Sequence, residues 1–96
     1  MNFVWDEAKR DRVFASRGID FSDFVPEFFD GRALLSVPTP RHGEDRYLSI
    51  GVLHGKAFAV VWMPRDGLIR IITARRARRE EERQYGAVFT GRAIHG

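Results

Sequence analysis

The feature that most constrains the fold is a dense apolar face in a short segment near the amino terminus. Its members recur at the spacing i, i+3, i+4, i+7 and i+8 of one helical face, and they are Phe21, Phe24, Val25, Phe28 and Phe29. Four phenylalanines on one face must pack into a core. Pro26 is not tolerated deep inside a helix, so we predict a short helix that begins near Ser22 or Asp23, with the proline in or near its first turn, and ends at Asp30-Gly31.

Two elements are predicted before this helix. Residues 2–5 form an apolar run typical of a strand, and Asp6 is a good N-cap for a helix over residues 7–17, which Gly18 would end. The apolar stripe of that helix is thin. Its best buried candidates are Ala8, Phe14 and Ala15.

The rest of the chain is rich in strand signals. Residues 33–37 predict a strand closed by Pro38 and Pro40, 41–45 a polar loop, 46–53 and 56–63 a hairpin turning at His54-Gly55, 64–67 a second turn, 68–74 a further strand and 78–85 a helix. The predicted fold class is α+β: a small antiparallel sheet with two N-terminal helices packed on it and a C-terminal helix. We expect one domain over residues 1–96, with 86–96 as a poorly ordered tail.

The strand register predicts where the arginines point. Pairing across the first hairpin places Arg46 opposite Met63, and pairing across the second turn places Arg70 opposite Val61. Arg46 and Arg70 are therefore predicted to share one face of the sheet. A one-residue bulge at the second turn would move Arg70 to the other face. That other face is predicted to carry Tyr47, Trp62 and Arg75.

The charge distribution favours a polyanionic partner. Sixteen lysines and arginines oppose thirteen acidic residues, and fourteen of the sixteen are arginine. Residues 1–40 carry five cations and seven anions, whereas residues 41–96 carry eleven and six. Arginine suits phosphate better than lysine does, so the basic half indicates nucleic-acid binding. A solvated, salt-bridged surface is the alternative explanation.

Several function classes are excluded or unsupported. The chain has no cysteine, so a disulfide, a thiolate zinc site and a thiol nucleophile are ruled out. It has no P-loop, dinucleotide fingerprint or HExxH motif. The histidines, at 42, 54 and 95, are far apart, so we predict no metal and no cofactor. The opening MNFVWDEAKR lacks the apolar core of a signal peptide and no window is long enough to span a membrane, so we expect a soluble, cytoplasmic protein.

Two groups of residues are candidates for chemistry. Five arginines fall within ten residues at the junction between the last strand and the last helix: Arg70, Arg75, Arg76, Arg78 and Arg79. The alternative is that Arg76, Arg78, Arg79 and Arg83 pair with Glu80, Glu81 and Glu82 on a solvated helix. His42 lies close in sequence to Glu44 and Arg46 and is a candidate acid or base, or else an exposed loop histidine.

The sequence also resembles the BrnT family. The blocks that carry the resemblance occur in the family's order and are FVWDEAKR at 3–10, GIDF at 18–21, EDRY at 44–47 with Ile50-Gly51, RIITARRA at 70–77, and Glu82-Arg83 with Tyr85. Pro26, and Thr73 where serine is common, depart from the pattern. Members are toxins of bacterial type II toxin–antitoxin systems with a RelE-like fold. The resemblance implies a ribonuclease neutralised by a BrnA-like antitoxin, whose DNA-binding part brings the complex to its operator.

The resemblance also implies site residues and a mechanism. Arg46, Arg70 and Arg75 match recurring basic positions, and with His42, Glu44 and Tyr85 they are the catalytic candidates; Tyr47 is a further possible acid or base. The RNA-binding candidates are Arg46, Arg65, Arg70, Arg75, Arg76 and Arg79. Glu82, Arg83 and Tyr85 would equally serve to dock a helix on the sheet. The implied reaction is metal-independent cleavage of RNA by an mRNA interferase, in which the 2′-hydroxyl attacks the adjacent phosphate.

Two other readings remain open at this point. The first is a catalytically silent module that binds RNA or the antitoxin on the same scaffold, because a fold does not fix its chemistry. The second is a DNA-binding regulator acting alone, although the sequence has no helix-turn-helix signature.

Overall fold

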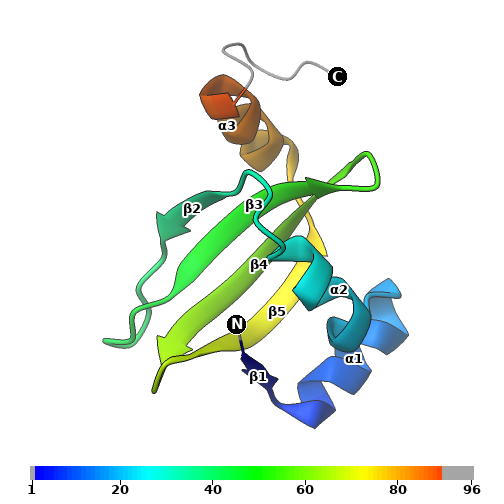
Figure 1. The fold of residues 1–96 in the computed structure, drawn as a ribbon, viewed down its shortest axis with the longest axis vertical. Coiled ribbons are helices and arrows are strands. Elements are labelled where there is room, and N and C mark those ends of the chain that lie inside the picture. The colour runs from blue at the N-terminus through cyan, green and yellow to red at the C-terminus, as the bar shows by residue number, and fades with distance from the viewer. Residues whose placement is uncertain (1, 90–96) are drawn as a thin grey trace.

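The computed structural model describes residues 2–89, which form three helices and one five-stranded sheet (Figure 1). In chain order the elements are β1 (Phe3–Trp5), α1 (Glu7–Arg17), α2 (Phe21–Phe28), β2 (Leu35–Pro38), β3 (Tyr47–Leu53), β4 (Lys56–Arg65), β5 (Leu68–Arg76) and α3 (Arg79–Phe89). The strand order across the sheet is β1-β5-β4-β3-β2. The predicted α+β class, with two N-terminal helices and a C-terminal helix, is confirmed.

The sheet is antiparallel from β2 to β5 and gains one parallel strand at its edge. β1 runs parallel to β5, with Phe3 opposite Ile69 and Trp5 opposite Ile71. Both helices lie between β1 and β2 in the chain, so β1 is free to join the far edge of the sheet. The sheet is therefore mixed. Within the described part of the chain, no helix is long and apolar enough to span a membrane.

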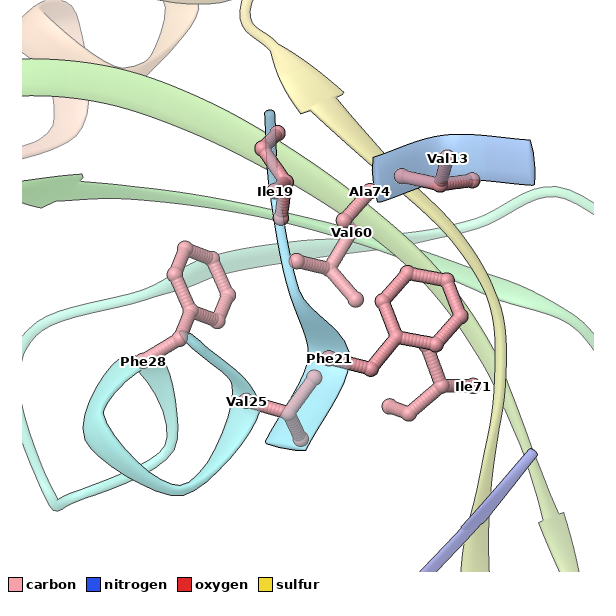
Figure 2. Packing of buried hydrophobic residues seen from close by; sticks show 8 residues of the cluster. All are labelled: Val13, Ile19, Phe21, Val25, Phe28, Val60, Ile71 and Ala74. Carbon is pink, nitrogen blue, oxygen red and sulfur yellow. The ribbon is translucent and has the colours of Figure 1, made fainter. Parts of the chain in front are cut away.

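The core lies between α2 and one face of the sheet, which we call the helix face. Phe21, Val25 and Phe28 of α2 are fully buried. They pack with α1 and the central strands, and Figure 2 shows these side chains gathered around Val60, Ile71 and Ala74. Phe24 and Phe29 are partly buried and pack against the same cluster, so the predicted phenylalanine face is confirmed.

α2 starts earlier than predicted. The carboxylate of Asp20 caps it by accepting a hydrogen bond from the Ser22 N–H at 3.0 Å, and its first residue is Phe21. Pro26 consequently lies beyond the first turn, contrary to the prediction. The helix continues because Pro26 and Ser22 are both exposed, so water can solvate the Ser22 carbonyl that the proline leaves without a donor.

The buried residue of α1 was wrongly predicted. Val13 is buried, whereas Phe14 is 56% exposed and Ala8 and Ala15 are exposed. α1 contributes Val13 to the core and also contacts β5 through a polar side chain. This side chain is Arg17, which donates to the Ala74 carbonyl at 3.0 Å.

A paired arginine and aspartate link the first two helices. Arg10 of α1 donates to both carboxylate oxygens of Asp20, the cap of α2, at 2.8 and 3.2 Å. Hydrogen bonds from Arg10 lower the pKa of Asp20 to about 2. The same carboxylate therefore starts α2 and fixes its position relative to α1.

The chain reverses direction at three tight turns of the form X-Gly. His42-Gly43, His54-Gly55 and Asp66-Gly67 each have positive φ at both residues, as type I′ turns require. The hairpin at His54-Gly55 is confirmed. The segment 41–45, predicted as a loop, closes as a tight turn in which Arg41 and Glu44 pair through their backbones.

The second turn is also shorter than predicted. Pro64 and Arg65 belong to β4, and Arg65 pairs with Leu68, so Arg70 lies opposite Met63 rather than Val61. Pro64 is tolerated in this strand because the pairing of β4 with β3 ends at Trp62, before the proline is reached.

A one-residue bulge in β5 determines which arginines of this strand point away from the core. Trp62 pairs with Ile71 and Val61 pairs with Thr73, so Ile72 is the extra residue. Ile71 and Ala74 both point into the core, although their spacing of three would place them on opposite faces of a regular strand. Beyond the bulge, Arg75 therefore points to the face that Arg46 and Arg70 share. We call this the open face. The prediction that Arg75 lies on the opposite face is wrong.

α3 extends further than the sequence suggested. It continues through Gly86 to Phe89, so the predicted tail is wrong for residues 86–89, and residues 90–96 lie outside the described part of the chain. Gly86 is buried, and this packing outweighs the weak helix propensity of glycine. Figure 1 shows α3 at the end of the molecule away from α1.

We expect Gly51→Ala to destabilise the protein by about 1–3 kcal/mol, because added core atoms force side chains from their preferred positions. A Cβ at position 51 would lie 2.5 Å from Leu34 Cδ2 and 3.1 Å from the buried ring of Phe28. Thermal or urea unfolding measures the loss. In a Leu34→Ala background the same change should cost less. An equal cost in both backgrounds would show that the clash with Leu34 is not the cause.

Candidate functional site

The open face carries a cavity of about 320 Å³ beside the start of α3. Its floor is formed by Leu48 of β3 and Val61 of β4, which pair across the two strands. Charged side chains from the segment before β3, from β5 and from α3 surround this floor. The complete lining consists of Thr39, Arg41, Arg46, Leu48, Val61, Arg75, Arg78 and Glu81.

The cavity lining is strongly cationic. It contains four arginines and a single carboxylate, Glu81. Within residues 2–89, the guanidinium groups of Arg41 and Arg78 make no hydrogen bond or ion pair. Two unpaired guanidinium groups at one concavity favour a ligand with several negative charges.

Arg46 holds a donor that the protein does not satisfy. Its Nη2 donates to Glu44 Oε1 at 3.1 Å, but its Nε is buried and has no hydrogen-bond partner among the described residues. A buried donor without a partner is costly, and such groups concentrate at functional sites. The side chain as a whole is 22% exposed and lines the cavity, so its exposed part is what an anion there would contact.

Arg75 is held by the protein itself. Its Nη1 and Nη2 donate to the two carboxylate oxygens of Glu81 at 2.8 and 2.9 Å, a bidentate pair. Glu81 Oε1 also accepts from the backbone N–H of Arg78 at 2.7 Å, as the third residue of a helix does in a capping box. This pair therefore fixes the start of α3 against β5 and places Arg78 at the cavity.

The hydrogen bonds from Arg75 hold the pKa of Glu81 below its usual value, with a smaller contribution from the Arg78 N–H, although burial opposes the shift. The side chain of Glu81 is 11% exposed. Glu81 thus neutralises Arg75 within the cavity wall. The positive charge of the cavity comes from Arg41, Arg46 and Arg78.

The structure does not bring the other predicted RNA-binding arginines to this cavity. Arg70 lines a separate concavity next to α1. Arg65 is exposed at the end of β4, and Arg79 is exposed at the start of α3. Arg76 lies on the helix face, where its guanidinium is 5.5 Å from the centre of the Phe58 ring.

The candidate acids and bases divide in the same way. His42 and Glu44 lie on the turn that carries Arg41, and both are exposed. Tyr85 does not line the cavity, and its hydroxyl donates to the Ala33 carbonyl at 3.2 Å. Tyr47 is on the helix face, where its ring stacks on Trp62 with centroids 4.9 Å apart.

The salt-bridged alternative holds for one arginine of the last helix only. Arg83 pairs with Glu80 at 3.2 Å. Arg76, Arg78 and Arg79 form no ion pair within the described residues. The alternative is wrong for these three: Glu81 pairs with Arg75 and Glu80 with Arg83.

Sequence reasoning missed Arg41, Arg78 and Glu81 as parts of one site. Arg41 was placed in a polar loop. Arg78 was one of the five junction arginines, but a solvated, salt-bridged helix surface was kept as the alternative for it. One available signal was the spacing of three residues between Arg78 and Glu81, which matches a capping arrangement.

A second cavity of about 320 Å³ lies on the helix face, lined by Phe14, Phe24 and Phe58 among others. Its charged lining is mostly acidic, with Asp20, Asp23 and Glu27. Asp20 is paired with Arg10, and no lysine or arginine is among the described residues that line this cavity, so it does not fit a polyanion.

Removing the Glu81 carboxylate should destabilise the fold. We expect Glu81→Gln to lower the free energy of unfolding by about 3 kcal/mol, because it leaves Arg75 partly buried without its counter-charge. Glu80→Gln is the matched control on the same helix, where the carboxylate is exposed and should matter by less than about 1 kcal/mol. Equal losses in chemical denaturation would contradict this role of Glu81.

The contribution of Glu81 should also depend on pH. Its pKa is lower in the folded than in the unfolded state, so the folded protein binds fewer protons and the stabilisation is fully present above the unfolded value of about 4.3. It should disappear as the pH falls through the lower folded pKa. Melting curves of the wild type and Glu81→Gln should therefore converge in acid. A constant difference down to about pH 2 would contradict the linkage.

Comparison with known proteins adds an independent finding. Residues 5–81 match the family described as "Ribonuclease toxin, BrnT, of type II toxin-antitoxin system". The matched range includes all elements from α1 to β5 and the first residues of α3. Most of β1 precedes it, and the later turns of α3 follow it. No curated protein matches the sequence.

Proposed function

The chain belongs to the BrnT family of ribonuclease toxins of type II toxin–antitoxin systems, and from this premise we propose that the arginine-lined cavity on the open face binds and cleaves RNA. The observation that carries the proposal is the composition of the cavity. Four arginines surround it, and the one carboxylate among them is occupied by Arg75 and the start of α3. The remaining positive charge is available to a phosphodiester.

The proposed reaction needs no metal ion. The 2′-hydroxyl oxygen of the RNA loses its proton and attacks the adjacent phosphorus, and the P–O bond to the 5′ oxygen of the next nucleotide breaks. The products are a 2′,3′-cyclic phosphate and a 5′-hydroxyl, which receives a proton. The protein has to hold the phosphate in line, stabilise the extra negative charge on its oxygens and transfer the two protons.

The first two tasks fall to arginines. Arg46 is the main candidate for stabilising the phosphorane, because the exposed part of its side chain lines the cavity and its Nε has no acceptor among the described residues. Arg41 and Arg78 would bind the phosphate oxygens from the two sides of the cavity. Arg75 is a positioning residue, because its guanidinium is engaged by Glu81.

Proton transfer is assigned to the turn beside the cavity. Of the four candidates considered from the sequence, His42 and Glu44 are the two that lie on the turn with Arg41. Glu44 contacts Arg46 directly, at 3.1 Å, so a carboxylate base there would lie close to the bound phosphate. His42 would then supply the proton to the leaving oxygen.

The proposal includes the biological context of the enzyme. The substrate is messenger RNA in the cytoplasm, and a BrnA-like antitoxin inhibits the toxin by covering the open face. That face exposes apolar residues next to the arginines, since Leu48, Val61 and Met63 are only partly buried. Such a mixed surface suits a protein partner. The antitoxin would in turn bring the complex to operator DNA.

We expect purified protein to cut RNA in the presence of EDTA and Arg46→Ala to cut it about 10²–10³ times more slowly, the usual effect of losing one oxyanion-type donor. The products, separated on a gel and treated with acid or phosphatase, should carry the cyclic phosphate. Arg83→Ala removes an arginine from the exposed surface of α3 and should cut RNA at the wild-type rate.

A silent binding module would give a different result. It would bind RNA or the antitoxin in the same EDTA buffer without producing fragments, and Arg46→Ala would weaken binding only. Cleavage that Arg46→Ala leaves unchanged would remove the proposed role of this cavity.

A further inference from the structure

Arg70 lies in a second concavity, which the proposed cleavage site does not use. This concavity has a volume of about 180 Å³ and lies where β1 ends and α1 begins. Ile71 and Ile72, at the bulge of β5, are part of its lining. Its charged part comes from α1 and β5 and consists of Asp6, Lys9, Arg12 and Arg70.

The three cations of this concavity have no acidic partner. Within residues 2–89, the charged groups of Lys9, Arg12 and Arg70 make no ion pair and no side-chain hydrogen bond. The one carboxylate, Asp6, is occupied as the N-cap of α1, where it accepts from the backbone N–H groups of Ala8 and Lys9. The concavity therefore keeps a net positive charge.

Other cations of α1 show that this is not a general property of the helix. Arg10 pairs with Glu7 and Asp20, and Arg17 donates to Thr73 and to a backbone carbonyl of β5. These two arginines connect α1 to the rest of the fold. Lys9 and Arg12, three residues apart and thus neighbours on the helix surface, instead line this concavity together with Arg70.

We propose that Lys9, Arg12 and Arg70 form a second phosphate-binding subsite, which holds the RNA strand away from the bond that is cleaved. This inference rests on the proposed function and adds to it the path of the substrate. The ligand of the subsite is a backbone phosphate of single-stranded RNA. Three convergent cations suit such a group, because arginine and lysine donors make charge-assisted hydrogen bonds to phosphate oxygens.

β5 connects the two sites. Arg70 and Arg75 both belong to β5 and point to the open face. They are five positions apart in the chain, which corresponds to about 16 Å along an extended strand. One phosphate cannot reach both positions. An RNA strand of several nucleotides can follow β5 from the cavity to the subsite. The subsite should therefore raise the affinity for long RNA and leave the affinity for very short RNA unchanged.

Binding of a non-cleavable RNA tests the subsite without relying on catalysis. The probes are fluorescent 2′-O-methyl oligonucleotides of about three and about twelve nucleotides, one shorter than typical single-strand site sizes and one within their range. Binding is measured by anisotropy in EDTA at several salt concentrations. The test variant is Lys9→Ala/Arg70→Ala. The control variant, Lys56→Ala/Arg83→Ala, removes the same types and number of charges from exposed positions outside both concavities. Melting curves check that both variants are folded.

The test variant should bind the long probe roughly tenfold more weakly and lower the salt slope by about 1.4, which corresponds to two lost phosphate contacts on a single strand. Its affinity for the short probe should stay within about twofold of the wild type, and the control should bind both probes as the wild type does. This pattern would support the subsite.

Three results would overturn it. If the control loses as much affinity as the test variant, only net charge matters. If the test variant loses affinity equally for both probes, Arg70 acts in the cleavage cavity. If the wild type binds neither probe, both the subsite and the proposed function fail. By contrast, length-dependent binding by a protein that never cuts RNA would support the subsite and overturn the proposed catalysis.

Discussion

The bulge at Ile72 is the constraint on which the arrangement of the open face depends. The phenylalanine layer of α2 needs both Ile71 and Ala74 beneath it, and a regular strand could provide only one of them. Because of the extra residue, β5 places both Ile71 and Ala74 in the core, while Arg70 and Arg75 point to the open face. A demand of the apolar core thus sets the direction of the charged side chains on the other side of the sheet.

Stability and site geometry are also coupled at the start of α3. The carboxylate of Glu81 caps the helix, pairs with Arg75 and thereby places Arg78 at the cavity. A buried ion pair of this kind contributes less to stability than its distances suggest, because both groups lose hydration. Its clearer role here is to give α3 one position on the sheet, which leaves the neighbouring guanidinium groups unpaired and available.

Features set by residues close together in the sequence could be predicted, whereas features set by contacts between distant segments could not. The phenylalanine face and the hairpin at His54-Gly55 depend on local periodicity and turn chemistry, and both were predicted correctly. The buried residue of α1 and the orientation of Arg75 depend on contacts between distant segments, and both were predicted wrongly. The cavity joins the turn at 41–44, two strands and α3, so no local pattern could have assembled its lining.

The acidic cavity on the helix face has a consequence for how the molecule meets a polyanion. Carboxylates line the cavity on one side of the sheet and unpaired guanidinium groups line the cavity on the other, so the two cavities differ in local charge. In the field of a nucleic acid, such a difference favours orientations in which the arginine-lined cavity approaches the strand first. Productive encounters are therefore enriched at low ionic strength, and dissolved salt reduces this alignment over distances beyond about 10 Å.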